Sequence, residues 1–536
     1  MFLPSRCRLF ILSRSIAASF SAVIALSIAP IPALAQSQVT QSQVTQVTKI
    51  QVATIQVTGS TLIPAAEIAA IVAPYENRLL TLAELRPVTE KLTQYYLDRG
   101  YLTSRAVLID QTLNSRSNQG SKVQIRVIEG KLERIDVQGN TRLPSSYIRD
   151  RLALADHIPL SSTDLENQLR LLKLDPLFSQ VEASLKEGTS LGKSVLRVQV
   201  TESPVWSGKV TIDNDINPSV GTEKFEISGA TQNLTGVGDR LSLSYARSFS
   251  GGANLWNLQY QRPLNSMNGT LTAQFAPNQY QITEASLRDL NIIGSSQTYD
   301  LTLRQPLVRS PSEEFALSLG LNHRNGETLI STFLANRSTT TALSFGQDYQ
   351  RRDRTGLWSA RSTFTVGLPW PIQEPTRPFI LWNGQLQRIQ LLSPGQTLIV
   401  QASWQLTPNA LPAAHQFSLG GVSRLRGYRP GIQSGDLGFT VSLDDQIVVT
   451  RDALGNPNFQ IVPFLDIGAV KNTRSDLGPD PSFLAGTGVS FRWKPHPRVN
   501  LQLDAALPLT QALTGRSDRN NTLQDFALYF STQYQF

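Results

Sequence analysis

From residue 204 to residue 536 the sequence repeats one pattern, in which apolar and polar residues alternate over short segments. A period of two residues gives a strand two different faces, so each segment predicts a β-strand with one apolar and one polar side. Leu241, Leu243 and Tyr245 alternate with Ser242 and Ser244, and the same alternation recurs in later segments. Sixteen segments can be placed in this way between residues 206 and 536. The pattern favours either a β-sandwich or a β-barrel.

The last segment, residues 524–536, separates these two folds. Its alternate residues form one apolar and aromatic face: Phe526, Leu528, Phe530, Thr532, Tyr534 and Phe536. A soluble domain has little reason for such a face, whereas a transmembrane barrel meets lipid there and carries aromatic girdles at both rims. The even number of strands also fits a bacterial outer-membrane barrel. With Tyr534 and Phe536 at its end, this segment resembles the assembly signal of outer-membrane proteins, which implies the barrel-assembly machinery and outer-membrane lipid as partners.

The connections between the predicted strands indicate how the barrel is oriented. Those after even-numbered strands are mostly short, such as 392–395 and 494–497, whereas several after odd-numbered strands are longer, namely 278–295, 325–338 and 507–523. Outer-membrane barrels have short periplasmic turns and long external loops. We therefore expect residues 204–536 to form a 16-stranded antiparallel barrel with both ends in the periplasm.

The start of the sequence predicts secretion. Arg6, Arg8 and Arg14 precede a mostly apolar stretch, and Ala33-Leu34-Ala35 fits a cleavage site, so residues 1–35 are interpreted as a signal peptide and 36–49 as a linker. An N-terminal membrane anchor is the alternative. Without the signal peptide, 46 basic and 41 acidic residues remain, an excess too small and too dispersed to indicate a nucleic-acid partner. The only cysteine, Cys7, lies in this segment, so we expect no disulfide afterwards.

Residues 50–203 contain a repeat. Ile55 to Pro64 matches Ile135 to Pro144, and each copy has a strand ending in glycine, a helical pattern and closing strands. Two small α+β modules are predicted, at 50–130 and 131–203. The shared Gly-x-Thr-x-x-Pro turn and the Tyr-Tyr-Leu-Asp-Arg-Gly-Tyr segment ending at Tyr101 resemble polypeptide-transport-associated (POTRA) domains. Because both ends of the predicted barrel lie in the periplasm, we expect the two modules there as well.

One connection, residues 407–437, differs from the rest. Its centre, residues 419–431, reads LGGVSRLRGYRPG, which suits neither a helix nor a strand. A connection this long in a compact fold is usually functional or disordered. Two strands later, if Leu465 faces lipid, Asp466 faces the lumen. A carboxylate in that position needs water or a cation, and arginine is its best planar match.

These two stretches together resemble the Omp85 superfamily, in which the sixth external loop folds back into the barrel. The superfamily's loop-tip motif is matched by Leu425, Arg426, Gly427 and Tyr428. Its Phe-x-Asp-x-Gly partner motif on the thirteenth strand is matched by Phe464, Asp466 and Gly468. The resemblance implies that Arg426 and Asp466 hold the loop inside the lumen, that Gly427 lets the tip turn, and that Tyr428 packs it in place.

Two modules before 16 strands narrow the resemblance to the two-partner secretion transporters, the haemolysin activation/secretion (TpsB) family. It implies export of a large β-helical partner, such as an adhesin or haemolysin-like protein, to the cell surface or medium. The chain departs from the family at two places. Residues 36–49 are short for the family's N-terminal plug helix, and Asp444 stands where relatives commonly have glutamate.

Two other functions stay open at this stage: a factor that assembles other barrels into the outer membrane, and a passive porin or surface receptor. An enzyme is not expected, because the sequence contains neither a nucleophile elbow nor a catalytic carboxylate pair. Residues 188–194 fall one residue short of a phosphate-binding loop and lead into a strand. The four histidines lack metal-ligand spacing, so neither a metal nor another cofactor is expected.

Overall fold

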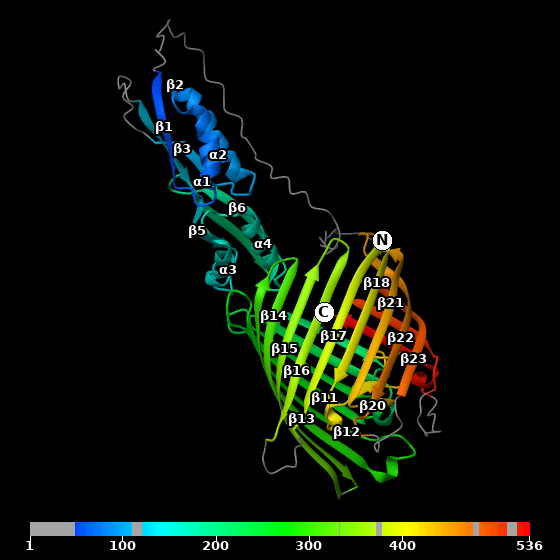
Figure 1. Cartoon of the computed structure of the whole chain (residues 1–536). Helices are drawn as coiled ribbons and strands as arrows, with labels where there is room; N and C mark the ends of the chain where they lie inside the picture. Colours follow the sequence, from blue (N-terminus) through cyan, green and yellow to red (C-terminus); the bar gives the residue numbers. More distant parts are fainter. Residues whose placement is uncertain (1–48, 110–119, 332, 371–377, 475–481, 512–521) are drawn as a thin grey trace, which may run out of the picture. The chain divides into compact units, whose positions relative to one another are not determined.

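The computed structural model describes residues 49–109, 120–331, 333–370, 378–474, 482–511 and 522–536 (Figure 1). The predicted signal peptide and nearly all of the predicted linker lie outside these residues. None of the helices among the described residues is long and apolar enough to span a membrane.

The first module is a four-stranded sheet with two helices. Its elements are β1 (Ile50–Thr58), α1 (Ala65–Val72), β2 (Arg78–Leu80), α2 (Leu82–Leu97), β3 (Arg105–Leu108) and β4 (Ser121–Ile128), and the sheet order is β2-β1-β4-β3. Helix α2 begins with a capping box between Thr81 and Glu84. Its residues Leu85, Val88 and Leu92 are fully buried, and their helical spacing places them on the one face that builds the core.

The second module repeats the plan with one strand fewer. It contains β5 (Lys131–Gln138), α3 (Ser145–Leu152), α4 (Ser162–Lys173), β6 (Phe178–Glu187) and β7 (Lys193–Glu202), and its sheet order is β5-β7-β6. Residues 188–192 are the turn between β6 and β7, closed by a hydrogen bond from Gly188 N to Lys193 O at 2.9 Å. The stretch that only partly matches a phosphate-binding loop is therefore a hairpin turn.

The repeated Gly-x-Thr turn has the same structural role in both modules. Gly59 has a φ of +80°, and a Cβ there would lie 2.4 Å from the carbonyl oxygen of Val127, a contact that excludes any side chain. Two residues later, the backbone N–H of Thr61 donates to Glu129 at 2.6 Å. The second module repeats the turn at Gly139, with the backbone N–H of Thr141 donating to Glu202 at 2.9 Å.

Sixteen of the remaining strands close into one antiparallel barrel, which confirms the predicted fold. The first eight are β8 (Trp206–Asp213), β9 (Lys224–Gln232), β10 (Arg240–Ser248), β11 (Ala253–Pro263), β12 (Thr270–Gln281), β13 (Ile292–Arg309), β14 (Glu313–Ile330) and β15 (Phe333–Arg352). The other eight are β16 (Gly356–Leu368), β17 (Ile380–Ser393), β18 (Gln396–Leu406), β21 (Leu437–Arg451), β22 (Pro457–Lys471), β23 (Ser482–His496), β24 (Val499–Pro508) and β25 (Leu528–Gln535). Strand β25 pairs with β8 and closes the ring.

Two predictions about the ends of strands were wrong. Residues 325–338 were expected to form a loop, but β14 and β15 continue through most of them, because the ladder hydrogen bonds join backbone groups and need no apolar face. The last strand was expected to begin at residue 524. Residues Leu523–Phe526 instead form a 3₁₀ turn, Ala527 takes a left-handed conformation with φ +53°, and β25 begins at Leu528. Phe526 fitted the two-residue period without belonging to the strand.

Candidate functional site

The connection 407–436 between β18 and β21 is ordered and has its own hairpin. Within it, β19 (Phe417–Leu419) pairs with β20 (Gln433–Gly435). The tip is closed by a hydrogen bond from Gly421 N to Tyr428 O at 2.9 Å. At Gly420, where φ is +96°, a Cβ would lie 2.0 Å from the carbonyl oxygen of Arg429, so the two sides of the tip meet at a position that requires glycine.

Arg426, at the loop tip, is paired with Asp466 on β22. Its Nε donates to one carboxylate oxygen and its Nη2 to the other, both at 2.7 Å, and its backbone N–H adds a third bond at 3.0 Å. The side chains are 6% and 2% exposed, so the pair is buried. A bidentate pair of planar groups fixes orientation as well as distance. The alternation along β22 has the expected phase, because Leu465 is 43% exposed and Asp466 is 1% exposed.

Three neighbours complete the surroundings of the Arg426 guanidinium. Asp444 on β21 accepts from Nη2 at 2.6 Å, and the hydroxyl of Ser442 both accepts from Nη2 and donates to Asp466. The ring of Phe464 lies 3.5 Å from the guanidinium carbon, within the range of a cation–π contact. Asp444, noted in the sequence only as a departure from relatives, is therefore a second carboxylate partner of Arg426.

Gly427 and Tyr428 are held by a residue that the sequence did not single out, Tyr529 on β25. Its hydroxyl accepts from Gly427 N at 3.1 Å and donates to the carbonyl oxygen of Tyr428 at 2.8 Å. The hydroxyl of Tyr428 donates to the carbonyl oxygen of Ala485 at 2.8 Å and also lies within hydrogen-bond distance of Thr510. Gly427 has a φ of +102°, so the expected turn at this residue requires its glycine.

Leu425 and Gly468 meet in an apolar cluster. The cluster contains Phe417, Leu419, Leu425, Tyr428, Val470 and Leu484. Leu425 is fully buried there. A Cβ on Gly468 would lie 3.0 Å from Leu419 Cδ2 and 3.1 Å from Leu425 Cδ1. The glycine of the Phe-x-Asp-x-Gly motif therefore makes room for the loop against the wall.

A second ion pair holds the loop near the start of the last strand. Arg429 donates to Asp525 at 2.5 Å, and Asp525 also caps the 3₁₀ turn by accepting from the backbone of Thr522. Across the tip, the Asn217 amide, in the connection after β8, donates to the carbonyl oxygen of Pro430 at 3.0 Å. Neither contact was predicted, because each joins residues that lie far apart in the sequence.

Tyr534 lies near the other end of β25 and Phe536 directly follows that strand, away from the loop-tip cluster. Both are exposed, at 45% and 65%, and their rings stack with centroids 6.4 Å apart. Among the described residues, no group of three or more His, Cys, Asp or Glu side chains could hold a metal ion.

Comparison with known proteins decides the family. The model of the haemolysin secretion/activation proteins ShlB/FhaC/HecB matches residues 192–493, and the ShlB-type POTRA domain model matches residues 50–130. The chain belongs to this family. It is thus an outer-membrane transporter of the two-partner secretion type, within the Omp85 superfamily, with its POTRA domains in the periplasm. The family consists of transporters of partner proteins rather than enzymes.

Individual relatives agree with this membership. The chain is 28% identical to the outer membrane transporter CdiB of Escherichia coli over 409 residues, which cover 71% of this chain and 66% of the relative. It is 26% identical to CdiB of Dickeya dadantii over 456 residues, which cover 81% and 79% of the two chains. The solved structure of CdiB from Escherichia coli matches with a TM-score of 0.69 at 23% identity and covers 93% of both chains.

Proposed function

We propose that this protein recognises an unfolded partner in the periplasm through its POTRA domains and exports it through the barrel lumen to the cell surface or medium. The observation that carries the proposal is a loop anchored by a buried ion pair, Arg426–Asp466, inside a closed barrel that follows two α+β modules, the first of which matches the POTRA model. A passive porin has no need of POTRA domains or of an ion pair that holds a loop in its lumen. Family membership supports secretion over assembly of other barrels.

The partner is captured as an added strand. In the sheet order β5-β7-β6, strand β6 has a neighbour on one side only, and its ten residues make it longer than β2 or β3, the edge strands of the first module. An extended segment that pairs with such an edge gains main-chain hydrogen bonds whatever its sequence, which suits recognition of an unfolded chain.

The loop-tip residues position the loop that the moving chain must pass. Arg426 and Asp466 anchor it to the wall, Gly427 allows the turn, and Tyr428 locks the tip against Ala485 and Thr510. The partner is a secreted β-helical protein of the adhesin or haemolysin kind. Relatives named as a haemolysin transporter in Proteus mirabilis and a heme/hemopexin transporter in Haemophilus influenzae support a protein cargo. The exposed Tyr534 and Phe536 form the signal that the barrel-assembly machinery recognises.

Co-expression with a candidate partner tests this function. A gene for a large β-helical protein is expressed with or without the transporter, and the partner is quantified in the medium, on the surface and in the periplasm. We expect export only when the transporter is present. Export that does not depend on the transporter, or a general loss of other outer-membrane proteins when the transporter is depleted, would contradict the proposal.

A further inference from the structure

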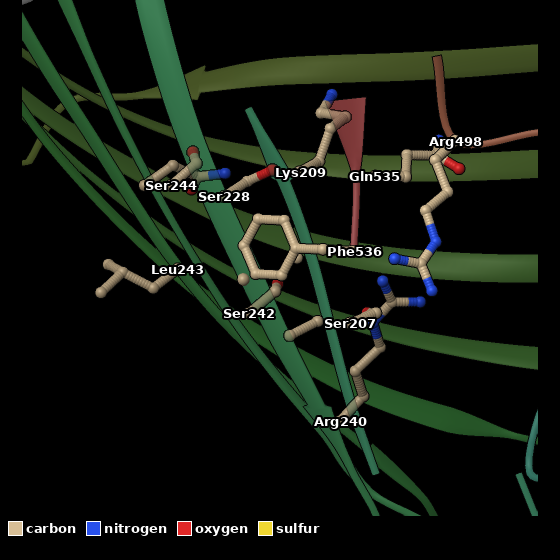
Figure 2. Close-up of a pocket in the computed structure, with 14 residues that line it drawn as sticks. Ser207, Lys209, Ser228, Arg240, Ser242, Leu243, Ser244, Arg498, Gln535 and Phe536 are labelled. Carbon is tan, nitrogen blue, oxygen red and sulfur yellow. The ribbon is translucent and has the colours of Figure 1, made fainter. Parts of the chain in front are cut away.

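The barrel has a cavity of about 650 Å³ at the join between its first and last strands. Strands β8, β9 and β10 line it, together with Arg498 of the turn before β24 and the chain end at Gln535 and Phe536 (Figure 2). It lies at the end of the barrel where the chain enters β8, opposite the end that carries the 407–436 connection. The end at which the chain enters β8 is the periplasmic mouth.

Two arginines meet at this cavity without a partner. Figure 2 shows the guanidinium groups of Arg240 and Arg498 pointing toward one another. Among the described residues, no carboxylate pairs with either guanidinium, and neither group donates a side-chain hydrogen bond. Like charges that face one another repel, so this arrangement favours an anion between them.

Several arginines on the barrel strands are neutralised by carboxylates. Arg304 pairs with Glu314 at 2.6 Å, Arg388 pairs with Asp353 at 2.7 Å, and Arg492 pairs with Asp444 at 3.3 Å. The barrel therefore has carboxylates available for arginines elsewhere on its strands. What distinguishes Arg240 and Arg498 is that their guanidinium groups face one another at the same cavity.

Apart from Lys209, which pairs with Glu226 at 3.9 Å, the polar groups around the two arginines are uncharged. Ser244 lies directly across the ladder from Ser228 on one side and from Asn257 on the other, and Ser242 lies two residues before Ser244 on the same face. Among the described residues, none of these three hydroxyls has a hydrogen-bond partner. The side-chain oxygen of Asn257 is buried and also lacks one. Hydroxyls and an amide that can turn its NH₂ inward are suitable donors to an anion.

The direction in which the side chains of β10 point indicates which kind of ligand can reach the cavity. Leu243, between the two serines of β10, is 46% exposed on the opposite, lipid-facing side. Ser242 and Ser244 therefore face the lumen, and so does Arg240, which has the same parity. A ligand among these groups is in the aqueous path of the exported chain rather than in the bilayer.

We propose that Arg240 and Arg498, with the serines between them, bind carboxylate side chains of the polypeptide as it enters the barrel. This inference rests on the proposed export function and adds a preference for acidic segments at the mouth. Two guanidiniums can each give a charge-assisted hydrogen bond to one carboxylate, while the neutral hydroxyls let the bound segment slide onward.

Binding of a fluorescently labelled glutamate–serine peptide to the purified full-length protein in detergent tests the site without requiring export. Arg240→Gln and Arg498→Gln are measured singly and together by fluorescence anisotropy, beside a lysine–serine peptide. We expect each substitution to weaken binding of the acidic peptide by about tenfold, because one charge-assisted hydrogen bond is lost. The matched control is Arg262→Gln, at the same end of the barrel on β11 but outside the cavity.

Unchanged affinity in the double variant, or an equal loss in the Arg262 control, would overturn the site. If the double variant instead loses binding to phosphatidylglycerol micelles and keeps the peptide, the site serves lipid and the inference also fails. Because each arginine is replaced separately, one variant that does not assemble leaves the other to decide. Failure of wild-type export in the co-expression assay contradicts the proposed function and leaves this binding result standing.

Discussion

Replacing Arg426 with alanine should undock the loop while the barrel stays inserted. The substitution removes the side-chain hydrogen bonds to Asp466, Asp444 and Ser442 and the contact with the ring of Phe464. Asp466 is 1% exposed, so its charge is left buried with only the backbone N–H and Ser442 as donors. Removing one partner of a buried pair costs about 3–5 kcal/mol, which corresponds to a shift of roughly a hundredfold or more in the docking equilibrium.

Export of a co-expressed partner and heat-modifiability on electrophoresis measure the two consequences separately. We expect loss of export with an unchanged shift between the folded and unfolded barrel bands. The matched control is Arg361→Ala, whose pair with Asp348 joins neighbouring strands at a side chain that is 61% exposed, so about 1 kcal/mol or less is at stake. Normal export by the Arg426 variant would refute the role assigned to the anchor. Loss of the folded band would show that the pair serves barrel stability instead.

Three further substitutions or conditions test other parts of the structure. Tyr529→Phe removes the hydroxyl that joins Gly427 to the last strand and should weaken loop docking by about 1–3 kcal/mol, measured as faster protease cleavage of the loop. Gly468→Ala should overpack the loop cluster near Leu419, at a cost of about 1–3 kcal/mol, and lower the barrel's melting temperature. The control for steric crowding is Gly395→Ala, because a Cβ at Gly395 meets nothing within 4 Å. Burial raises the pKa of Glu202, but hydrogen bonds from the backbone of Leu143 and from Arg142 outweigh it and lower that pKa to about 2. The stability that Glu202 contributes to the second module, about 3 kcal/mol, is therefore present above pH ~4.5 and is lost as the pH falls toward 2. Hydrogen exchange in residues 139–152 should speed up over that range, after correction for intrinsic rates, and Glu202→Gln should abolish the change.

The barrel can be predicted from the sequence because the polarity of the side chains along each strand matches the environments of its two faces. Leu465 and Asp466 differ in polarity because one meets lipid and the other the lumen, and this local rule repeats along every strand that crosses the membrane. The rule fails at residues 325–338, where the ladder continues although the side chains no longer alternate. Strand pairing there depends on hydrogen bonds between backbone groups, which do not affect the pattern of side chains.

The candidate site was only partly predictable, for a different reason. The Arg426–Asp466 pair could be inferred because both residues belong to motifs. Tyr529 could not, because it occupies an inward position on a strand whose aromatic residues were interpreted as lipid-facing, and its partner Gly427 is 102 residues away. Asp525 was not recognised because the last strand was predicted to begin at residue 524, and Asp525 was therefore counted as part of it. Contacts between segments that lie far apart in the sequence can be recognised only in the closed barrel.

The arrangement of the anchors bears on how the loop can move. The tip is fixed at one side to β22 through Asp466 and at the other to β25 and its preceding turn through Tyr529 and Asp525. Undocking the tip breaks both anchors together, so the docked state is the favoured one at rest. A ligand shifts such an equilibrium only by its difference in affinity for the two states. Any displacement of the tip during export must therefore be driven by the partner, through contacts that it makes only when the loop has left the wall.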